Sequence, residues 1–440
     1  MGAIRNLIYI FGDQLDLNGS CLEGFDSDRD KVCMAEVEEE ATYVWSHKIR
    51  LAYFFSAMRH FREDLKKKRI PVDYRALSKK KTESECGSFR ELLISKVEEL
   101  QPERLVITLP GDYRVLHTVR SLAGELDIDL EVRPDTHFFS TPEEFEDWAE
   151  GKKNLVMEFF YRTLRKKHDI LMDPDGAPVG GAWNFDPQNR ETFGKEGPTN
   201  LPEPPNFKID EITAEVLEMV ETRFPDHPGT LDHFNLPVSR PQALYLLRHF
   251  VENCLESFGP YQDAMWTDEP FLHHSRLSAP LNLKLLNPRE VLDTVIDRAH
   301  ETGFPLNSLE GFVQQILGWR EYIRGIYWLE MPKYLDLNVL DTHEEMPSFY
   351  WDGETDMECL RQSMKQVLDH GYAHHIQRLM VLGLFSMLYG VDPKKFHEWH
   401  MAMYVDAIDW VSLPNALGMS QYGDGGIVGS KPYCASANYI

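Results

Sequence analysis

The strongest constraint on the fold is a change of pattern along the chain. Strand-like and helix-like segments alternate over residues 1–135, whereas the pattern beyond residue 208 is helical throughout. The first apolar run, residues 7–11, ends at Gly12-Asp13, which is typical of a buried parallel strand. Because parallel strands need crossover helices, this order predicts an α/β domain with an open, doubly wound parallel sheet at residues 1–135. The expected strands are 7–11, 32–37, 72–77, 105–109 and 128–132, and the expected helices are 47–69, 89–100 and 113–126.

Two further regions follow the α/β domain. Residues 172–208 are rich in Pro and Gly, and we place a long interdomain connector at 136–208. Residues 209–440 are predicted to form an all-α domain, because apolar side chains recur at three- and four-residue spacing. The expected helices are 211–224, 241–257, 288–302, 308–330, 358–370, 372–389 and 393–411.

The composition narrows the class of protein. With 440 residues, 42% hydrophobic and 12% aromatic, the chain has material for two or three packed domains and is not a disordered acidic protein. A net charge of -25 argues against a protein that coats nucleic acid non-specifically, although a local basic groove stays compatible with it. No apolar run reaches about 18 residues and the start lacks a signal-peptide order, so we expect a cytoplasmic protein without a membrane partner. We also expect a monomer.

Several cofactor signatures are absent from the sequence. The six cysteines include no C-x-x-C pair, so their spacing predicts neither a disulfide framework nor a zinc knuckle. His397-Glu398-Trp399-His400 lacks the spacing of a zinc-protease helix. No G-x-G-x-x-G follows the first strand, which disfavours an NAD-type site. Gly12-Asp13-Gln14 lies where ligands of such sheets bind, but the residues alone favour an ordinary strand-to-loop turn.

Two segments of the helical region combine polar side chains with helix starts or apolar helices. In His273-His274-Ser275-Arg276-Leu277-Ser278-Ala279-Pro280, Ser278 is an expected N-cap, and the group either binds a phosphate or only caps a helix. In residues 372–380, His374 and Arg378 share a helical face, and a buried guanidinium needs a carboxylate. Asp406, expected on the next helical segment, is the candidate partner, and the alternative is a structural ion pair with packed histidines.

Two more segments are candidates for a site. The apolar helix at 315–322 carries Trp319, Arg320 and Glu321, and the loop at 413–433 is rich in Gly, polar and aromatic residues. Loops of this composition commonly line functional sites.

Five motifs, in order, resemble those of the photolyase/cryptochrome superfamily, and within it the iron-sulfur bacterial branch, the prokaryotic (6-4) photolyases. The match spans essentially the whole chain. The motifs are Phe11-Gly12-Asp13-Gln14-Leu15, Trp183-Asn184-Phe185-Asp186, Gly318-Trp319-Arg320-Glu321-Tyr322, Tyr372-Ala373-His374-His375-Ile376-Gln377-Arg378-Leu379-Met380 and Gly418-Met419-Ser420-Gln421.

The resemblance implies a U-shaped FAD in the helical domain, with Ser275 to Ser278 on its phosphates and Arg378 paired with Asp406 against the isoalloxazine. It also implies repair of (6-4) photoproducts flipped out of UV-damaged DNA, driven by light and reduced FAD. By analogy His375 is the proton donor to the lesion. The implied FAD-binding positions are Tyr261, His274, Ser275, Arg276, Leu277, Ser278, Trp319, Arg320, Arg378 and Asp406, and the implied catalytic and lesion-pocket positions are Gln315, His374, His375, Leu379, Met419 and Tyr433.

The resemblance further implies an antenna chromophore, 6,7-dimethyl-8-ribityllumazine, bound in the α/β domain. The resemblance therefore favours reading Gly12-Asp13 as part of a chromophore-binding site rather than as an ordinary strand-to-loop turn. The implied antenna positions are Asp13, Glu40, Tyr43 and Phe54.

The sequence departs from the family in two places. Relatives hold a 4Fe-4S cluster with four cysteines, but only Cys359 matches, and the other three would follow residue 440. Because Cys359 is retained, we expect a shortened cluster protein rather than one that dispensed with the cluster. Electron-transfer positions match at Trp351 and Trp399, but His400 stands where relatives use an aromatic residue, so we expect slower or rerouted photoreduction.

Three functions remain open from sequence. The leading hypothesis is a light-driven (6-4) photolyase, favoured by the retained His375, Met419 and Tyr433. The alternatives are a blue-light signalling cryptochrome that binds FAD without repair, and a flavoprotein that has lost activity.

Overall fold

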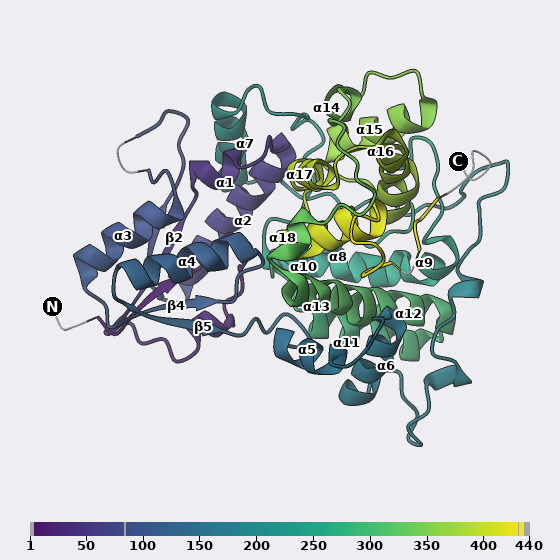
Figure 1. The fold of residues 1–440 in the computed structure, drawn as a ribbon, viewed down its shortest axis with the longest axis horizontal. Coiled ribbons are helices and arrows are strands. Elements are labelled where there is room, and N and C mark those ends of the chain that lie inside the picture. Colours follow the sequence, from purple (N-terminus) through teal and green to yellow (C-terminus); the bar gives the residue numbers. More distant parts are fainter. Residues whose placement is uncertain (1–3, 83–84, 430, 435–440) are drawn as a thin grey trace.

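The computed structural model describes residues 4–82, 85–429 and 431–434. A sheet-containing unit lies on one side and a bundle of helices on the other, as Figure 1 shows. The predicted α/β and all-α classes are therefore both confirmed.

The sheet has five parallel strands in the order β3-β2-β1-β4-β5. In its central register Ile8 lies opposite Val32 on one side and Val106 on the other. Each strand begins within two residues of its predicted start, because continuous apolar runs mark strands that are buried on both faces. The strands are β1 Asn6–Tyr9, β2 Asp30–Ala35, β3 Val72–Arg75, β4 Arg104–Thr108 and β5 Asp129–Arg133.

Helices cover both faces of the sheet. Alternate side chains point to opposite faces, so Leu7 and Tyr9 pack with α3 (Phe89–Leu100) and α4 (Tyr113–Glu125). Ile8 and Ile10 pack on the other face with α2 (Lys48–Lys67), whose apolar stripe follows its predicted period.

The predicted connector contains ordered helices. α5 (Pro142–Ala149) begins with a capping box at Thr141, and its Phe145 packs edge-to-face on Tyr322 with ring centroids 5.8 Å apart. The later part of the connector has two short 3₁₀ turns, Val179–Gly181 and Asp186–Gln188, and is otherwise irregular. The connector also contains α6 (Met157–His168). In the α/β region, a short helix α1 (Glu38–Thr42) lies before α2.

The rest of the described chain is helical and has no named strand. None of its helices is both long enough and apolar enough to cross a membrane. These helices are α7 Glu211–Arg223, α8 Arg240–Asn253, α9 Leu255–Tyr261, α10 Ser278–Asn282, α11 Pro288–Thr302, α12 Leu306–Val313, α13 Glu321–Glu330, α14 Phe349–Asp352, α15 Glu358–His370, α16 Leu384–Tyr389, α17 Pro393–Met403 and α18 Asp409–Leu413.

Three sequence predictions about local structure are wrong. Ser278 is the first residue of α10 rather than its N-cap, because its hydroxyl bonds another segment instead of the helix backbone. The helix predicted at 372–389 begins only after His374, and α17 ends at Met403, so Asp406 lies in a loop. Apolar periodicity continues through such interruptions, so it does not reveal them.

Three π-helical segments were also not expected: Gln314–Arg320, Gln377–Gly383 and Pro414–Ser420. The first interrupts the helix predicted at 308–330, and the second leads into α16. A π-helical turn shifts the side chains that follow it around the helix axis and often marks a functional site.

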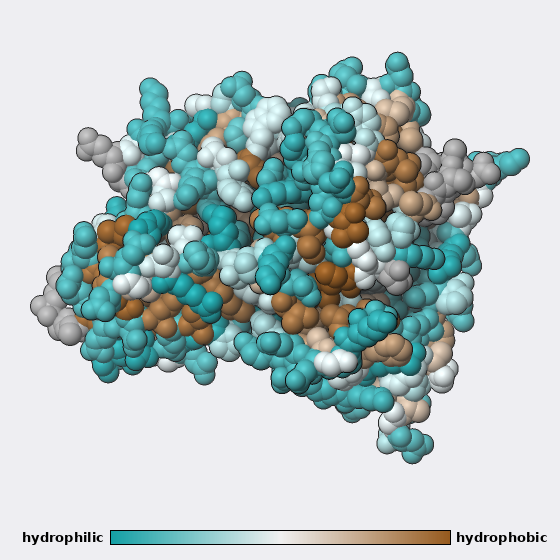
Figure 2. Space-filling view, viewed as in Figure 1, coloured by the Kyte–Doolittle hydropathy of each residue, from teal (hydrophilic) through white to brown (hydrophobic). Residues whose placement is uncertain are grey.

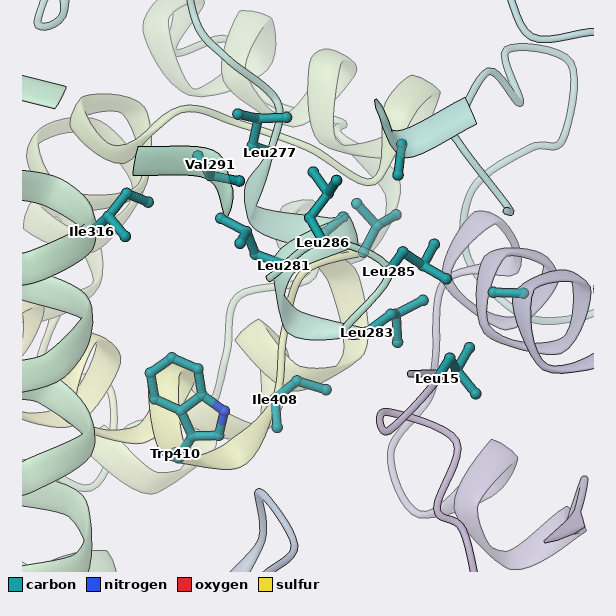
Figure 3. Close-up of a cluster of buried hydrophobic side chains, with 14 of the residues drawn as sticks. Leu15, Leu277, Leu281, Leu283, Leu285, Leu286, Val291, Ile316, Ile408 and Trp410 are labelled. Atoms are coloured by element: carbon teal, nitrogen blue, oxygen red, sulfur yellow. The ribbon is translucent and has the colours of Figure 1, made fainter. Parts of the chain in front are cut away.

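The two domains share an apolar core, part of which Figure 3 shows around α10. Leu15 follows β1 and packs in the same buried cluster as Leu283, and its backbone N–H donates to the Leu283 carbonyl at 3.0 Å. Ile408 and Trp410 complete the cluster from the C-terminal part of the chain. This continuous packing holds the sheet and the helical domain together.

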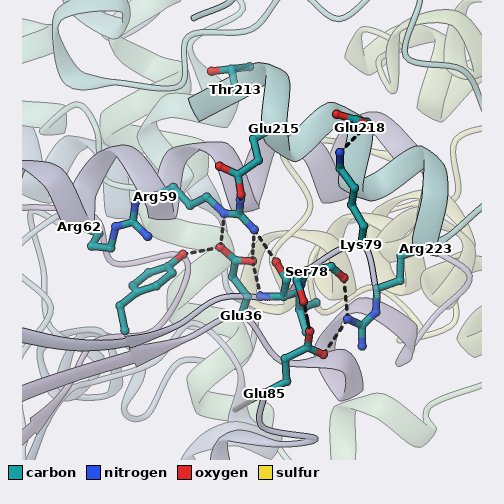
Figure 4. Close-up of polar contacts among 12 residues, drawn as sticks. Glu36, Arg59, Arg62, Ser78, Lys79, Glu85, Thr213, Glu215, Glu218 and Arg223 are labelled. Carbon is teal, nitrogen blue, oxygen red and sulfur yellow. Dashed lines mark hydrogen bonds and ion pairs between the residues drawn. The ribbon is translucent and has the colours of Figure 1, made fainter. Parts of the chain in front are cut away.

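A buried ion-pair network fixes α2 and α7 to the edge of the sheet (Figure 4). The Arg59 guanidinium donates to both carboxylate oxygens of Glu36, at 2.7 and 2.9 Å, and also contacts Glu215 of α7. Arg223 at the end of α7 pairs with Glu85 at 2.7 Å. Buried charges of this kind require partners, which the network supplies.

The face in Figure 2 is mainly hydrophilic, with apolar patches over both domains. This agrees with the acidic, charge-rich composition.

Candidate functional site

The helical domain encloses a cavity of about 530 Å³, a size typical of cofactor sites. All three π-helical segments contribute to its wall, as do α10 and the turn before it. The unexpected helix geometry is therefore concentrated at one place in the molecule.

An ion pair lies in the wall of this cavity. Arg378 Nη1 and Nη2 donate to Asp406 Oδ1 and Oδ2 at 3.0 and 3.1 Å. The Ser278 hydroxyl also donates to Asp406 Oδ2 at 2.7 Å. Burial alone would raise the pKa of Asp406, but Arg378 and these hydrogen bonds hold it below its usual value. The predicted pairing of Arg378 with Asp406 is thus present, and Asp406 is a fixed anion.

Three histidines lie beside this pair. His374 is buried and its ring stacks on His274, with centroids 4.5 Å apart. His375 faces the cavity, which accounts for its exposure. Surrounding protein and the nearby Arg378 lower the pKa of His375 to about 4, so its ring is neutral at pH 7 in the free protein.

Several buried polar atoms on the cavity wall have no hydrogen-bond partner among the described residues. These are Arg276 Nη1, Arg320 Nε, His374 Nε2 and His400 Nε2. Arg276 is stacked over Phe271 at 3.9 Å, and burial lowers the pKa of its guanidinium to about 10. Unpaired buried donors of this kind are costly, so the wall fits a ligand that carries phosphate or carbonyl oxygens.

Most of the sequence-predicted site residues meet in this cavity. The exception among the predicted FAD and lesion positions is Tyr261, which lies outside the lining and stacks on Phe193 with centroids 4.6 Å apart. The predicted residues that line it are His274, Ser275, Arg276, Leu277, Ser278, Gln315, Trp319, Arg320, His374, His375, Arg378, Leu379, His400, Asp406, Met419 and Tyr433.

Two carboxylates on the wall were not predicted. Asp186 accepts a hydrogen bond from Gln314 Nε2 at 3.3 Å, and burial raises its pKa. Burial also raises the pKa of Asp263, which Arg190 partly offsets. Asp186 belonged to a quoted motif, whereas no spacing pattern distinguishes Asp263.

The predicted electron-transfer residues form a cluster behind the cavity. His400 lines the cavity, and its ring centroid is 5.5 Å from that of the buried Trp399. Trp351, at the end of the short helix α14, packs against the same apolar cluster as Trp399.

A second cavity, of about 160 Å³, lies at the carboxyl ends of the strands in the α/β domain. Asp13, Glu40 and Phe54 line it as predicted, whereas Tyr43 does not. Tyr43 is 54% exposed and lies under the Arg114 guanidinium at 4.4 Å. A Cβ at Gly12 would come 2.9 Å from the Met58 sulfur, so any other residue at this position would displace the Met58 side chain.

Charged groups surround the second cavity. Arg114 donates to both carboxylate oxygens of Glu40, at 2.9 and 2.8 Å, and also contacts Asp112. Burial and the nearby Asp409 raise the pKa of Asp112 to about 7. Arg50 donates to the Ala407 carbonyl at 2.8 Å, and burial lowers its pKa to about 10. At about 160 Å³ this cavity is smaller than the cavity of about 530 Å³ in the helical domain.

The described residues do not fit a 4Fe-4S cluster. Within residues 4–82, 85–429 and 431–434, no three His, Cys, Asp or Glu side chains gather where they would hold a metal ion. Cys359 is partly buried in α15, and all six cysteines are free thiols.

A parallel sheet joined to a helical domain with a large cavity between its helices is the fold of photolyases and cryptochromes. A bacterial class III photolyase from Agrobacterium tumefaciens has the same fold, with a TM-score of 0.66 at 15% identity, over 98% of this chain and 82% of that chain. A Synechocystis cryptochrome aligns with a TM-score of 0.65 at 14% identity, over 100% of this chain and 86% of that chain.

The chain belongs to the deoxyribodipyrimidine photo-lyase-related protein family, whose model matches residues 8–236. It is also 44% identical to a (6-4) photolyase of Agrobacterium fabrum over 437 residues, which cover 99% of this chain and 85% of that protein.

Proposed function

We propose that the protein is a light-driven (6-4) photolyase, which repairs (6-4) pyrimidine–pyrimidone photoproducts in DNA by electron transfer from reduced FAD. The observation that carries this proposal is the meeting of His375, Met419 and Tyr433 with the Arg378–Asp406 pair in one cavity. The 44% identity to a (6-4) photolyase supports it over nearly the whole chain.

The large cavity would hold the FAD. Arg378 and Asp406 would face its ring system, while Ser275 and the unpaired Nη1 of Arg276 would bind its phosphates. Reduced FAD, when bound and excited by light, supplies one electron to the lesion and takes it back after repair. The protein's part is to bind, orient and keep water from the reacting groups.

The damaged dinucleotide, two linked pyrimidines of one strand, would be flipped out of the duplex into the cavity. Met419 and Leu379 offer apolar surface to it, which offsets the few kcal/mol of lost stacking. His375 would lie against the lesion and hold the proton that the reaction needs. Because the surrounding protein and Arg378 lower the pKa of His375 to about 4, the ring would take up this proton when the negatively charged DNA binds.

The remaining assignments follow from this function. Residues 1–135 would form an antenna unit holding a lumazine in the second cavity, with Asp13, Glu40 and Phe54 on its wall. Residues 136–208 would connect it to a catalytic unit at 209–440. The protein would act on UV-damaged DNA as a monomer in the prokaryotic cytoplasm.

The test is illumination of purified, reductant-treated protein with an oligonucleotide carrying a (6-4) lesion, with repaired product followed by chromatography. Light-dependent product above the dark control is expected. Tight flavin binding without any product would contradict repair and favour the blue-light signalling alternative, which uses the same fold.

A further inference from the structure

A covalent and hydrogen-bonded path leads outward from Trp399. Its indole N–H donates to the Tyr350 carbonyl at 2.8 Å, and Trp351 is the next residue in the chain. One hydrogen bond and one peptide unit therefore join the buried Trp399 to the half-buried Trp351. The Tyr350 side chain is poorly suited to electron transfer, because an oxidised tyrosine must lose its hydroxyl proton. The Tyr350 hydroxyl donates to the Leu382 carbonyl at 2.6 Å, and a carbonyl does not take up that proton.

Trp351 in turn contacts a tryptophan of the other domain. The ring centroids of Trp45 and Trp351 are 5.2 Å apart, with planes inclined by 44°. Trp45 is 46% exposed and lies between α1 and α2, where the α/β domain meets α17 (Figure 1). The segment is firmly held, since the His47 N–H donates to the Ala402 carbonyl at 2.8 Å and Val44 packs in the Trp399 cluster.

We propose that Trp45 is the outermost member of an electron relay that runs from solvent through Trp351 and Trp399 toward the large cavity. This inference rests on the proposed function, because it needs a flavin in that cavity. It assigns a role in photoreduction to a residue of the α/β domain that no family position suggested.

With an oxidised flavin bound and excited by light, Trp399 would give it one electron. Trp351 would then give one electron to the oxidised Trp399, and Trp45 one electron to the oxidised Trp351. The oxidised Trp45 releases its indole proton to water and becomes a neutral radical. A thiol in solution then returns one electron and one proton to Trp45 and is left as a thiyl radical.

Burial sets the direction of this transfer. A cation on Trp399, which is fully buried, is deprived of water, and its N–H is bound to a carbonyl that takes no proton. A cation on the exposed Trp45 is hydrated and loses its proton readily. The positive charge is therefore more stable at Trp45, and its return to the flavin is slowed.

The test compares the flavin-loaded full chain with Trp45→Phe, which keeps an aromatic ring but is much harder to oxidise. Flavin reduction under light is followed by absorbance over a range of thiol concentrations, and tryptophan radicals by transient absorption. We expect a several-fold slower reduction at limiting thiol and a shorter-lived radical. Trp266→Phe is the matched control, because Trp266 is also exposed, at 39%, but contacts Phe193 rather than the relay.

The double variant Trp45→Phe/Trp351→Phe distinguishes electron transfer through Trp351 from a loss of packing at Trp45. If Trp45 acts through Trp351, its loss adds nothing once Trp351 is removed, whereas additive losses would overturn the relay. Parent-like reduction rates and radical lifetimes in Trp45→Phe would overturn it as well. Repair by chemically reduced parent protein is a separate measurement, so a failure of the repair function is distinguishable from a failure of the relay.

Discussion

The guanidinium of Arg378 and the carboxylate of Asp406, 28 positions apart, meet through two hydrogen bonds of 3.0 and 3.1 Å. Arg378 reaches Asp406 from the start of a π-helical segment, and Asp406 approaches from the loop after α17. The backbone of the same loop is tied to α10, since Asn282 Nδ2 donates to the Asp406 carbonyl at 2.7 Å. The pair therefore joins three segments of the cavity wall at one point.

Arg378→Ala or Asp406→Ala should lose most of the bound flavin. Removing one partner leaves the other charge buried and unpaired, at a cost of about 3–5 kcal/mol. The measurement is the ratio of flavin to protein absorbance after purification. Arg361→Ala is the control, because Arg361 forms an exposed pair with Glu358. Full flavin occupancy in both cavity variants would remove this pair from the proposed FAD site.

His375→Ala should abolish repair while leaving flavin content and damaged-DNA binding within a few fold. A group that donates a proton during the reaction lowers turnover more than ground-state affinity. His374→Ala should instead give unstable protein, because His374 is buried and stacked on His274. Repair by flavin-loaded His375→Ala at near the parent rate would show that His375 is not the acid.

The pH profile of the parent gives a second check on His375. With its pKa lowered to about 4, the protonated fraction in the free protein grows as the pH falls. We therefore expect kcat/KM for a lesion-bearing oligonucleotide to rise as the pH is lowered from about 8 to about 5. A profile that falls over this range would contradict a protonated His375.

Glu40→Ala should release the antenna chromophore and leave FAD bound, since the two cavities lie in different domains. The substitution also frees Arg114, whose two hydrogen bonds to Glu40 shape one wall of the smaller cavity. Chromophore content is measured by fluorescence and chromatography of the extracted protein. Glu39→Ala, one exposed residue away, is the control. Absence of lumazine even in parent protein from a lumazine-producing host would refute the antenna.

Asp112→Asn should make the free energy of unfolding less dependent on pH, because the variant lacks the carboxyl group that the parent must ionise as the pH rises. The folded-state pKa of Asp112 is raised to about 7 from an ordinary value of 3.8, so folding takes up a proton between these values. The stability this proton contributes is complete below about pH 4 and is lost as the pH rises through about 7. The variant should narrow the difference in unfolding free energy between pH 5 and pH 8 by about 1–3 kcal/mol. Asn still caps α4.

The free energies of unfolding at pH 5 and pH 8 are measured by denaturant titration of the parent and of Asp112→Asn. Asp175→Asn, an exposed connector position, is the control and should follow the parent. An unchanged difference in Asp112→Asn would show that Asp112 is ionised in the folded protein at pH 5.

The sequence by itself determined the two fold classes, because apolar periodicity reports the local burial of each strand and helix. It also indicated Asp406 as a candidate partner for Arg378, since a buried guanidinium needs an anion. Only the structure selected Asp406, because Asp369, Asp392 and Glu398 lie closer to Arg378 along the chain. The role of Ser278 required the tertiary structure, because its hydroxyl could either accept from a helix backbone N–H or donate to Asp406, and it donates to Asp406.

Only the tertiary structure placed Tyr261 outside the cavity and Asp263 on its wall, since nothing in the neighbouring sequence distinguishes the two positions. The same holds for Trp45, whose contact with Trp351 crosses the domain boundary. Local periodicity extends over a few turns of chain, whereas these contacts depend on how α1, α14 and α17 pack once both domains have formed. The physical reason is that a side chain's neighbours are set by the packing of distant segments, which periodicity does not encode.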